Sequence, residues 1–363
     1  MMHIDNIINK ALKNEPLTFL EAIDIYKNAQ LSDLMFAANE IRKKWHPENY
    51  VTWIIDRNVN ITNVCTSGCL FCNFHCSQSS EKAYITNIDE YVKKLEELFS
   101  LGGDQLLLQG GMHPDLKLND YEILFRELKK QFPRLKLHAL GPPEIVYLSK
   151  GEGCSYNETL VRLVNTGLDS LPGAGAEILV DEVRSKISKN KCTVDEWLEA
   201  MHQAHKLNLA TSATMMFGHI ETPENRIEHL IKIRDLQAKK PENVKGFLSF
   251  IPWTFQSENT ALKRKYPNIK PISSTDYIRL IAISRIVLNN ISNIQASWLT
   301  VGTETAQICL HAGANDMGSI MIEENVVSAA GANFKIDTET MKKKIEEADF
   351  IPKKRNQQFE IFG

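Results

Sequence analysis

The sequence has no apolar stretch of the roughly 18 uninterrupted residues that a membrane-spanning helix needs. Its polar N-terminus also has no apolar signal-peptide core. The formal net charge is only −3, so the chain carries no excess of positive charge for nucleic acid or an anionic membrane. It also has no low-complexity linker. These absences predict a soluble, cytoplasmic protein whose partners include no nucleic acid and no membrane.

The length and composition are those of a globular protein with a sizeable core. The chain has 363 residues, of which 43% are hydrophobic and 24% charged. Two Lys/Arg-rich stretches near the C-terminus, residues 342–344 and 353–355, alternate with acids, and we expect a solvated helix face and a solvated tail there. The pattern predicts a helical N-terminal extension over residues 1–48 and one barrel domain over residues 49–363.

From about residue 51 onward, short apolar runs alternate with longer segments of helical periodicity. Repeated strand-then-helix units predict a parallel sheet, and this many units predict an α/β fold of the (β/α)8, or TIM-barrel, type. A doubly wound open sheet is the competing architecture, because periodicity does not distinguish the two. The expected strands are 59–64, 105–109, 135–140, 170–171, 211–217, 246–251 and 293–297, with a shorter run near Ala314. The expected helices are 88–101, 121–132, 193–207, 223–238 and 275–289.

The ends of the expected strands favour the barrel. Nearly every strand is followed by a cluster of glycine, proline or polar residues, as in residues 109–111 and 218–221. In a parallel barrel these ends share one face, and active sites lie on that face. We therefore expect side chains from several loops to meet over a single mouth.

The cysteines are the most specific chemical signal. The chain has seven, and four of them fall within residues 65–76, a pattern typical of metal binding in a reducing compartment. Cys65, Cys69 and Cys72 have the spacing C-x3-C-x2-C. Three thiolates on a [4Fe–4S] cube leave one iron without a protein ligand. The amino and carboxylate groups of S-adenosylmethionine can chelate such an open iron.

Two other interpretations of these cysteines stay open. A structural zinc site would need a fourth ligand, which His75 or Cys76 can supply, although zinc sites favour paired ligands far apart in the sequence. A pure electron-transfer cluster would use four cysteines, with Cys76 as the fourth, but that spacing is unlike the usual ferredoxin runs. We expect Cys76 to be a spare thiol.

The sequence resembles the radical S-adenosylmethionine superfamily, and within it the family of cyclic dehypoxanthine futalosine synthases. The resemblance extends over almost the whole chain from about residue 45. The strings that carry the resemblance are DRNVNITNVCTSGCLFC, LLLQGGMHPDL, LDSLPGAGAEIL, ATMMFGHIETPE, FIPWTFQ, IQASWLT and GANDMGSIMIEENVVSAAG. The last three look more particular to this family than to its sister enzymes. One departure is visible: the family usually continues Ala-Phe-Tyr-Arg after the third cysteine, where this chain has Asn73 to Cys76.

The resemblance implies two cofactors, a [4Fe–4S] cluster and S-adenosylmethionine. It places Gln109, Gly110 and Gly111 at the methionine amino group, because two glycines let the backbone approach a ligand closely. Glu177 lies at a strand end, where a carboxylate can accept hydrogen bonds from ribose hydroxyls. Arg184 lies two helical turns further on and can hold the methionine carboxylate. A Glu/Arg salt bridge without a cofactor is the alternative for that pair.

The resemblance also implies a reaction. A 5′-deoxyadenosyl radical would take hydrogen from C4′ of dehypoxanthine futalosine, and the carbon radical would close onto the benzoate ring, in the menaquinone pathway. Candidate acceptors for the final proton are Glu144, His138 and His219, which we do not rank. Trp253 and Trp298 are candidates for an apolar wall or for core packing.

Three functions stay open. The first is this cyclase, with dehypoxanthine futalosine as its small-molecule substrate and an external one-electron donor of the flavodoxin or ferredoxin type. The second is a sister enzyme that makes aminofutalosine or the deazaflavin precursor. The third is a non-catalytic iron–sulfur electron carrier or sensor, which would leave the converging loops without a purpose.

Overall fold

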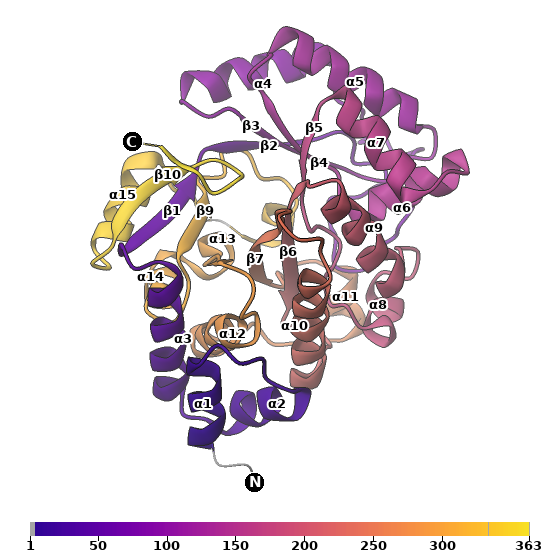
Figure 1. The fold of residues 1–363 in the computed structure, drawn as a ribbon. Coiled ribbons are helices and arrows are strands. Elements are labelled where there is room, and N and C mark those ends of the chain that lie inside the picture. The colour runs from indigo at the N-terminus through magenta and orange to yellow at the C-terminus, as the bar shows by residue number, and fades with distance from the viewer. Residues whose placement is uncertain (1–3, 333, 363) are drawn as a thin grey trace.

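The computed structural model describes residues 4–332 and 334–362. Seven consecutive parallel strands form one sheet in chain order (Figure 1). They are β2 (Asp56–Asn60), β3 (Gln105–Gln109), β4 (Lys136–Ala139), β5 (Leu168–Leu171), β6 (Ala210–Phe217), β7 (Gly246–Thr254) and β8 (Asn293–Ile294). A second sheet has the order β11-β10-β1-β9 and consists of β1 (Tyr50–Ile54), β9 (Asp316–Ser319), β10 (Ile351–Arg355) and β11 (Ile361–Phe362).

The two sheets join into a closed ring. β1 runs into β2 through the single residue Ile55, so the two act as one bent strand. β9 pairs with β1 in parallel and is bridged to the end of β8 through Gln295 and Asp316. The ring therefore runs from the bent strand β1–β2 through β3, β4, β5, β6, β7 and β8 to β9, which pairs back with β1. This confirms the predicted TIM-type α/β barrel.

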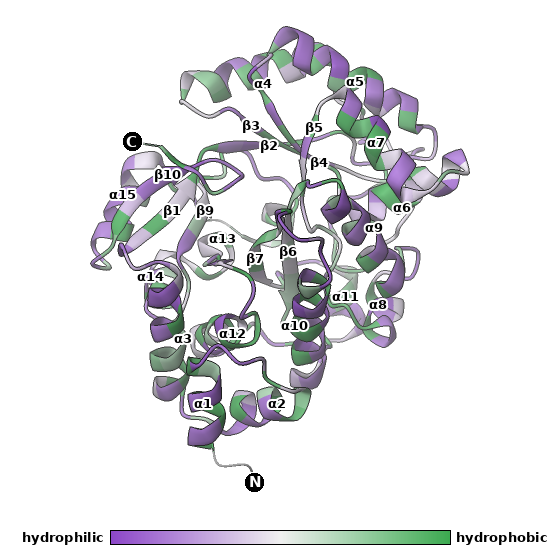
Figure 2. Ribbon diagram, viewed as in Figure 1, coloured by the Kyte–Doolittle hydropathy of each residue, from purple (hydrophilic) through white to green (hydrophobic). Residues whose placement is uncertain are grey.

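Helices cover the outside of the ring. Figure 2 shows green and purple bands on the outer helices α4 (Ile88–Ser100) and α5 (Leu118–Gln131), as expected where one apolar face packs on the sheet. The other helices of the barrel are α6 (Pro142–Glu152), α7 (Tyr156–Thr166), α8 (Asp181–Ile187), α9 (Val194–Lys206), α10 (Pro223–Ala238), α11 (Ala261–Lys265), α12 (Ser274–Val287), α13 (Trp298–Val301), α14 (Thr303–Leu310) and α15 (Thr338–Glu346), with a 3-10 turn over Ser328–Ala330. None of the described helices is long and apolar enough to cross a membrane.

The N-terminal helices α1 (Ile4–Leu12), α2 (Phe19–Asn28) and α3 (Leu31–Trp45) lie against the barrel (Figure 1). α3 packs along α12, and α2 packs against α10. Their buried residues, including Ile25 and Leu34, join the same apolar core as the barrel helices. The division of the chain into an extension over 1–48 and a barrel over 49–363 stays a prediction.

Two expectations need correction. The first strand of the barrel is not residues 59–64: it covers β1 and β2 and ends at Asn60, because the inward face of β2 carries polar side chains that an apolar pattern does not pick out. The stretch 353–355 is not a solvated tail, because it belongs to β10 and Arg355 is only 5% exposed. Stretch 342–344 lies on α15, with the side chains half-buried or exposed as expected.

Candidate active site

A cavity of about 380 Å³ lies inside the barrel and opens at the carboxyl ends of its strands. Nine of the residues singled out from the sequence line it: Cys65, Cys69, Cys72, Gln109, Gly110, Gly111, His138, Glu144 and Glu177. Trp253 and Trp298 line it as well. Arg184 and His219 do not. The structure thus brings together most of the predicted site, with contributions from most strands of the ring.

The three-cysteine motif, Cys65, Cys69 and Cys72, sits on the loop that follows β2. The backbone N–H of Met112 donates to Cys65 Sγ at 3.3 Å. Ser67 Oγ lies 2.9 Å from Cys65 Sγ and 3.4 Å from Cys69 Sγ. Polar groups close to sulfur stabilise thiolates, which are the form that binds iron.

The pKa values of the two other thiols, Cys69 and Cys72, are shifted in opposite directions. Burial raises the pKa of Cys69 to about 11. Burial also opposes ionisation of Cys72, but contacts from His75 and backbone N–H groups prevail and hold its pKa below the usual value. A buried thiol of high pKa ionises readily only beside a cation, and iron would supply one.

Cys76 lies outside the cavity lining. Its backbone anchors the cysteine loop, because Cys65 N donates to Cys76 O at 3.2 Å and Cys76 N donates to Asn63 O at 2.9 Å. Among residues 4–332 and 334–362, no three His, Cys, Asp or Glu side chains are gathered to hold a single metal ion. Thiolates on one zinc ion lie about 4 Å from each other, whereas a cube takes each thiolate on a separate iron.

Gly110 and Gly111 are required by the cysteine loop itself. A Cβ at Gly111 would lie 2.1 Å from the carbonyl oxygen of Val64, and one at Gly110 would lie 3.1 Å from the backbone nitrogen of Ile61. Gly111 N also donates to Thr62 O at 2.8 Å. The glycines therefore let β3 pack directly against the segment that leads to the cysteines, a role that the sequence pattern did not indicate.

Lys191 is the functional candidate that the sequence reading missed. Its Nζ lies 2.6 Å from Glu177 Oε1 and 5.2 Å from the centre of the Phe71 ring. Burial disfavours the ammonium, yet Cys69 and Glu177 prevail and hold the pKa of Lys191 above its usual value. Lys191 lies two residues before the Thr193 to Glu196 capping box that begins α9, and no sequence pattern singled it out, because its partner Glu177 lies on another loop.

Arg184 supports the Glu177–Lys191 pair structurally. It is 3% exposed, and its guanidinium donates to Gly175 O at 3.0 Å, Ala176 O at 2.6 Å and Cys192 O at 2.7 Å. The side chain thereby ties together the loops that carry Glu177 and Lys191. Direct contact with a cofactor, as expected from the sequence, would require Arg184 to leave these carbonyls.

The three candidate proton acceptors differ in what they present to the cavity. Glu144 lies in the first turn of α6, and its Oε2 is buried with no hydrogen-bond partner within residues 4–332 and 334–362. Burial raises the pKa of Glu144 to about 7, partly opposed by Lys191. His138 is fixed on both ring nitrogens, with Nδ1 2.7 Å from Ser170 Oγ and Nε2 3.4 Å from Gln357 Nε2. Burial and the Arg355 cation lower the pKa of His138 to about 3.

His219 lies away from the cavity. Ile220 N donates to His219 Nδ1 at 2.7 Å, and His219 Nε2 lies 3.2 Å from Met216 O. Burial lowers the pKa of His219, opposed by the carboxylate of Glu221. Both ring nitrogens are therefore used within the loop after β6.

Comparison with known proteins decides what this cavity belongs to. Residues 59–233 match the model of the Radical SAM superfamily, and residues 244–362 match the model of the CofH/MqnC C-terminal region. A "Cyclic dehypoxanthine futalosine synthase" from Halalkalibacterium halodurans is 39% identical over 360 residues, covering 99% of this chain and 95% of that protein. The chain belongs to the radical SAM superfamily.

Other relatives bear different names. A "Cyclic dehypoxanthine futalosine synthase" from Streptomyces coelicolor is 40% identical over 357 residues, covering 98% of this chain and 88% of that protein. A "5-amino-6-(D-ribitylamino)uracil--L-tyrosine 4-hydroxyphenyl transferase" from Methanococcoides burtonii is 38% identical over 324 residues, covering 88% and 86%. The solved structure of methylornithine synthase (PylB) has a TM-score of 0.72 at 19% identity, covering 97% of this chain and 98% of that chain, and supports the fold alone.

This radical SAM enzyme uses a [4Fe–4S] cluster and S-adenosylmethionine, and the residues at the mouth fit both. The three-cysteine motif faces the cavity with polar groups close to two of its sulfurs. Beside it lie the Glu177–Lys191 pair and an unpartnered oxygen of Glu144. A thiolate set, a carboxylate, an ammonium and a free acceptor oxygen together suit a cluster with a zwitterionic, ribose-bearing ligand.

Proposed function

We propose that this radical SAM enzyme converts dehypoxanthine futalosine to cyclic dehypoxanthine futalosine in menaquinone biosynthesis. The observation that carries the proposal is the 39–40% identity to two synthases of that name over 98–99% of this chain. When bound, the cluster and S-adenosylmethionine supply a 5′-deoxyadenosyl radical that can take hydrogen from C4′ of the ribose. The chain itself must bind, orient and shield the substrate.

The contacts at the mouth suggest how the cofactors are held. We assign the three-cysteine motif to three of the four irons, and Gln109, Gly110 and Gly111 to the methionine amino group. We assign Glu177 to the ribose hydroxyls, from which its carboxylate can accept hydrogen bonds. Lys191, rather than Arg184, is the cation within the cavity for the methionine carboxylate, while Arg184 positions the two loops that carry Glu177 and Lys191.

Glu144 is our candidate for the group that accepts the proton released when the benzoate ring regains aromaticity. Of the three candidates, it has an unpartnered oxygen and lines the cavity. The nitrogens of His138 and His219 already face protein groups at 2.7–3.4 Å. A general base must have a free acceptor within hydrogen-bond reach of the proton it takes.

A second function keeps support from a specific observation. The transferase from Methanococcoides burtonii is 38% identical, almost as similar as the two synthases, and the C-terminal model that matches residues 244–362 carries both names, CofH and MqnC. Transfer of a hydroxyphenyl group to 5-amino-6-(D-ribitylamino)uracil is therefore the alternative. An external one-electron donor of the flavodoxin or ferredoxin type is part of either proposal.

Product analysis tests the choice. The reconstituted enzyme is incubated without oxygen with reductant, S-adenosylmethionine and either substrate, and the products are identified by mass spectrometry. The proposal expects substrate-dependent 5′-deoxyadenosine and a product two hydrogens lighter than dehypoxanthine futalosine. Turnover of 5-amino-6-(D-ribitylamino)uracil with tyrosine, and none of dehypoxanthine futalosine, would contradict it.

A further inference from the structure

The floor of the cavity is built by the C-terminal segment of the chain. β10 ends at Arg355, and the residues that follow cross the barrel near the starts of β3 and β4. Gln357 Oε1 accepts from Gln105 Nε2 at 3.1 Å, and Gln357 Nε2 lies 3.4 Å from His138 Nε2. Arg355, Gln357 and His138 all line the cavity. Residues 355–357 thus close the end of the cavity that lies away from the three-cysteine motif.

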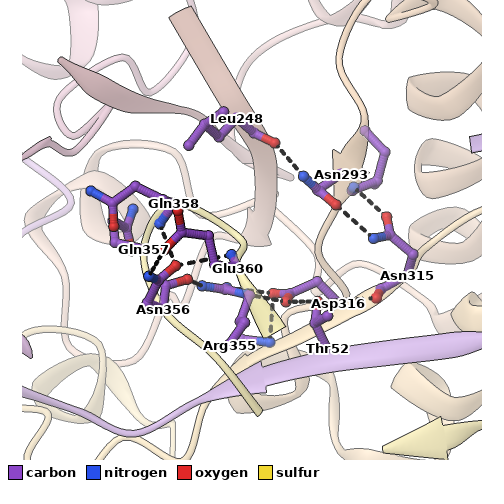
Figure 3. Close-up of polar contacts among 12 residues, drawn as sticks. Thr52, Leu248, Asn293, Asn315, Asp316, Arg355, Asn356, Gln357, Gln358 and Glu360 are labelled. Carbon is purple, nitrogen blue, oxygen red and sulfur yellow. Dashed lines mark hydrogen bonds and ion pairs between the residues drawn. The ribbon is translucent and has the colours of Figure 1, made fainter. Parts of the chain in front are cut away.

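The charges of this floor are already balanced. Figure 3 shows Arg355 turned toward Asp316, which accepts from Arg355 Nε at 2.6 Å and from Arg355 Nη2 at 2.9 Å. Asp316 also accepts from Thr52 Oγ1 at 2.5 Å. Asp56, beside this pair, accepts from Ser319 Oγ and Gln105 Nε2, and its burial raises its pKa. The floor is rich in hydrogen-bonding groups and close to neutral.

A substrate carboxylate would find no free cation in the described part of the cavity wall. Lys191 and Arg355 are the lysine and arginine side chains that line it. We assign Lys191, which faces Glu177, to the methionine carboxylate, and Arg355 is paired with Asp316. On the floor, Asp56 lines the cavity and Arg355 is already paired with Asp316, so an added carboxylate would bring in a charge without a partner. Burying such a charge without a free partner is unfavourable. Uncharged hydroxyl groups, which both donate and accept, suit this floor better.

The wall just above the floor has unsatisfied hydrogen-bonding atoms. Asn58 and Asn60 follow Asp56 on the same face of β2, about 7 Å apart at each step. Asn58 Oδ1 and Asn60 Nδ2 are buried and have no hydrogen-bond partner in the part of the chain that the structure describes, and the two residues are 5% and 3% exposed. One atom is an acceptor and the other a donor. Both residues line the cavity. Buried amides in this state point to a polar ligand.

The register of β2 gives the depth of this wall. Asn60 pairs with Gln109, which we assign to the cofactor, whereas Asn58 pairs with Leu107 and Asp56 with Gln105. Asn58 is therefore one step below the cofactor level and one step above the floor. A group held at Asn58 would lie one step of β2 below the level of the residues that we assign to the cofactor.

We propose that Asn58 and Asn60, together with the neutral floor beneath them, bind the hydroxyl groups of the sugar portion of the substrate, and not its carboxylate. The inference rests on the proposed function, for which the sugar is the ribose of dehypoxanthine futalosine. Hydroxyls anchored at this depth would hold the sugar just below the residues that we assign to the cofactor. Asn58 is then a specificity-determining residue, because its acceptor oxygen has no other hydrogen-bond partner among the described residues.

Equilibrium binding tests the proposal without relying on turnover. Calorimetry is done without oxygen or reductant on cluster-loaded enzyme with S-adenosylmethionine. The ligands are dehypoxanthine futalosine, its analogue without the 2- and 3-hydroxyls, and its analogue without the carboxylate. Asn58→Ala is compared with Asn290→Ala, a matched control whose Oδ1 is also buried and unpartnered but lies outside the cavity. If the alanine variant does not load its cluster, Asn58→Leu, which keeps the size, replaces it.

Asn58→Ala is expected to raise the Kd of dehypoxanthine futalosine roughly five- to thirtyfold, the loss of one or two hydrogen bonds. The Kd of the analogue without the 2- and 3-hydroxyls should then be the same for the unsubstituted enzyme and Asn58→Ala within about twofold. The Kd of the analogue without the carboxylate should rise in Asn58→Ala as much as that of dehypoxanthine futalosine. Asn290→Ala should change none of these values. Equal penalties for all three ligands, or a penalty that vanishes without the carboxylate, would overturn the proposal. No binding of dehypoxanthine futalosine by the unsubstituted enzyme would overturn the proposed function as well.

Discussion

Replacing Arg355 with methionine is expected to leave the carboxylate of Asp316 buried without its cation. Asp316 is fully buried, and it receives two hydrogen bonds from Arg355, at 2.6 and 2.9 Å. Removing one partner of such a pair costs about 3–5 kcal/mol, since the remaining charge is uncompensated. Methionine keeps most of the side-chain volume, so the lost charge is the main change.

The size of the effect can be measured as a melting temperature. With about 2.1 cal/mol/K of unfolding entropy per residue, a chain of 363 residues has about 0.76 kcal/mol/K, so the Tm should fall by about 4–7 °C. Thermal unfolding of the cluster-loaded protein is followed by circular dichroism without oxygen. Arg355→Met combined with Asp316→Asn is the control and should recover more than half of the loss. A fall of less than about 1 °C, or no recovery in the double variant, would refute the assignment of this pair as a buried ion pair.

Three further predictions concern the mouth of the cavity. Alanine in place of any cysteine of the three-cysteine motif should remove the cluster, measured as iron content and visible absorbance, whereas Cys76→Ala should keep it. Full iron loading in a Cys69→Ala protein would contradict this prediction. Lys191→Ala should weaken S-adenosylmethionine binding at least tenfold in calorimetry, with the iron content unchanged, and Lys191→Arg should restore part of the affinity. Unchanged binding would instead favour Arg184 as the partner of the methionine carboxylate. Glu144 must be ionised to accept a proton, so product formation should rise with pH through about 7, and this limb should disappear in Glu144→Gln while substrate-dependent 5′-deoxyadenosine persists. A limb that is the same in both proteins would exclude Glu144.

The parts of the fold that the sequence predicts well are those with strong local signals. β3 and α10 lie at the expected residues, because a short apolar run and a Thr222-Pro223 helix start leave little ambiguity. β2 was placed too late, since the chain alternates buried polar residues there to line the cavity. β10 was missed because Lys353 and Lys354 resemble a solvated tail, although Arg355 next to them is buried against Asp316.

The candidate site shows the same division. The spacing of the three-cysteine motif identifies it without a structure, because a short loop must bring its own thiols together. Lys191 and Asn58 were not found, because their significance depends on contacts across the barrel with Glu177 and with the floor. Conversely, Arg184 and His219 were candidates from the sequence. Arg184 donates to carbonyl groups of two neighbouring loops, and both ring nitrogens of His219 face backbone groups of its own segment.

Isotope transfer from the substrate tests the central claim most directly. In the absence of oxygen, the enzyme is incubated with reductant, S-adenosylmethionine and dehypoxanthine futalosine that carries deuterium at C4′. The mass of the 5′-deoxyadenosine formed is then measured by mass spectrometry. The proposed function predicts 5′-deoxyadenosine one mass unit heavier, together with a cyclic product that has lost the label. Unlabelled 5′-deoxyadenosine formed at the same rate with and without this substrate would contradict it.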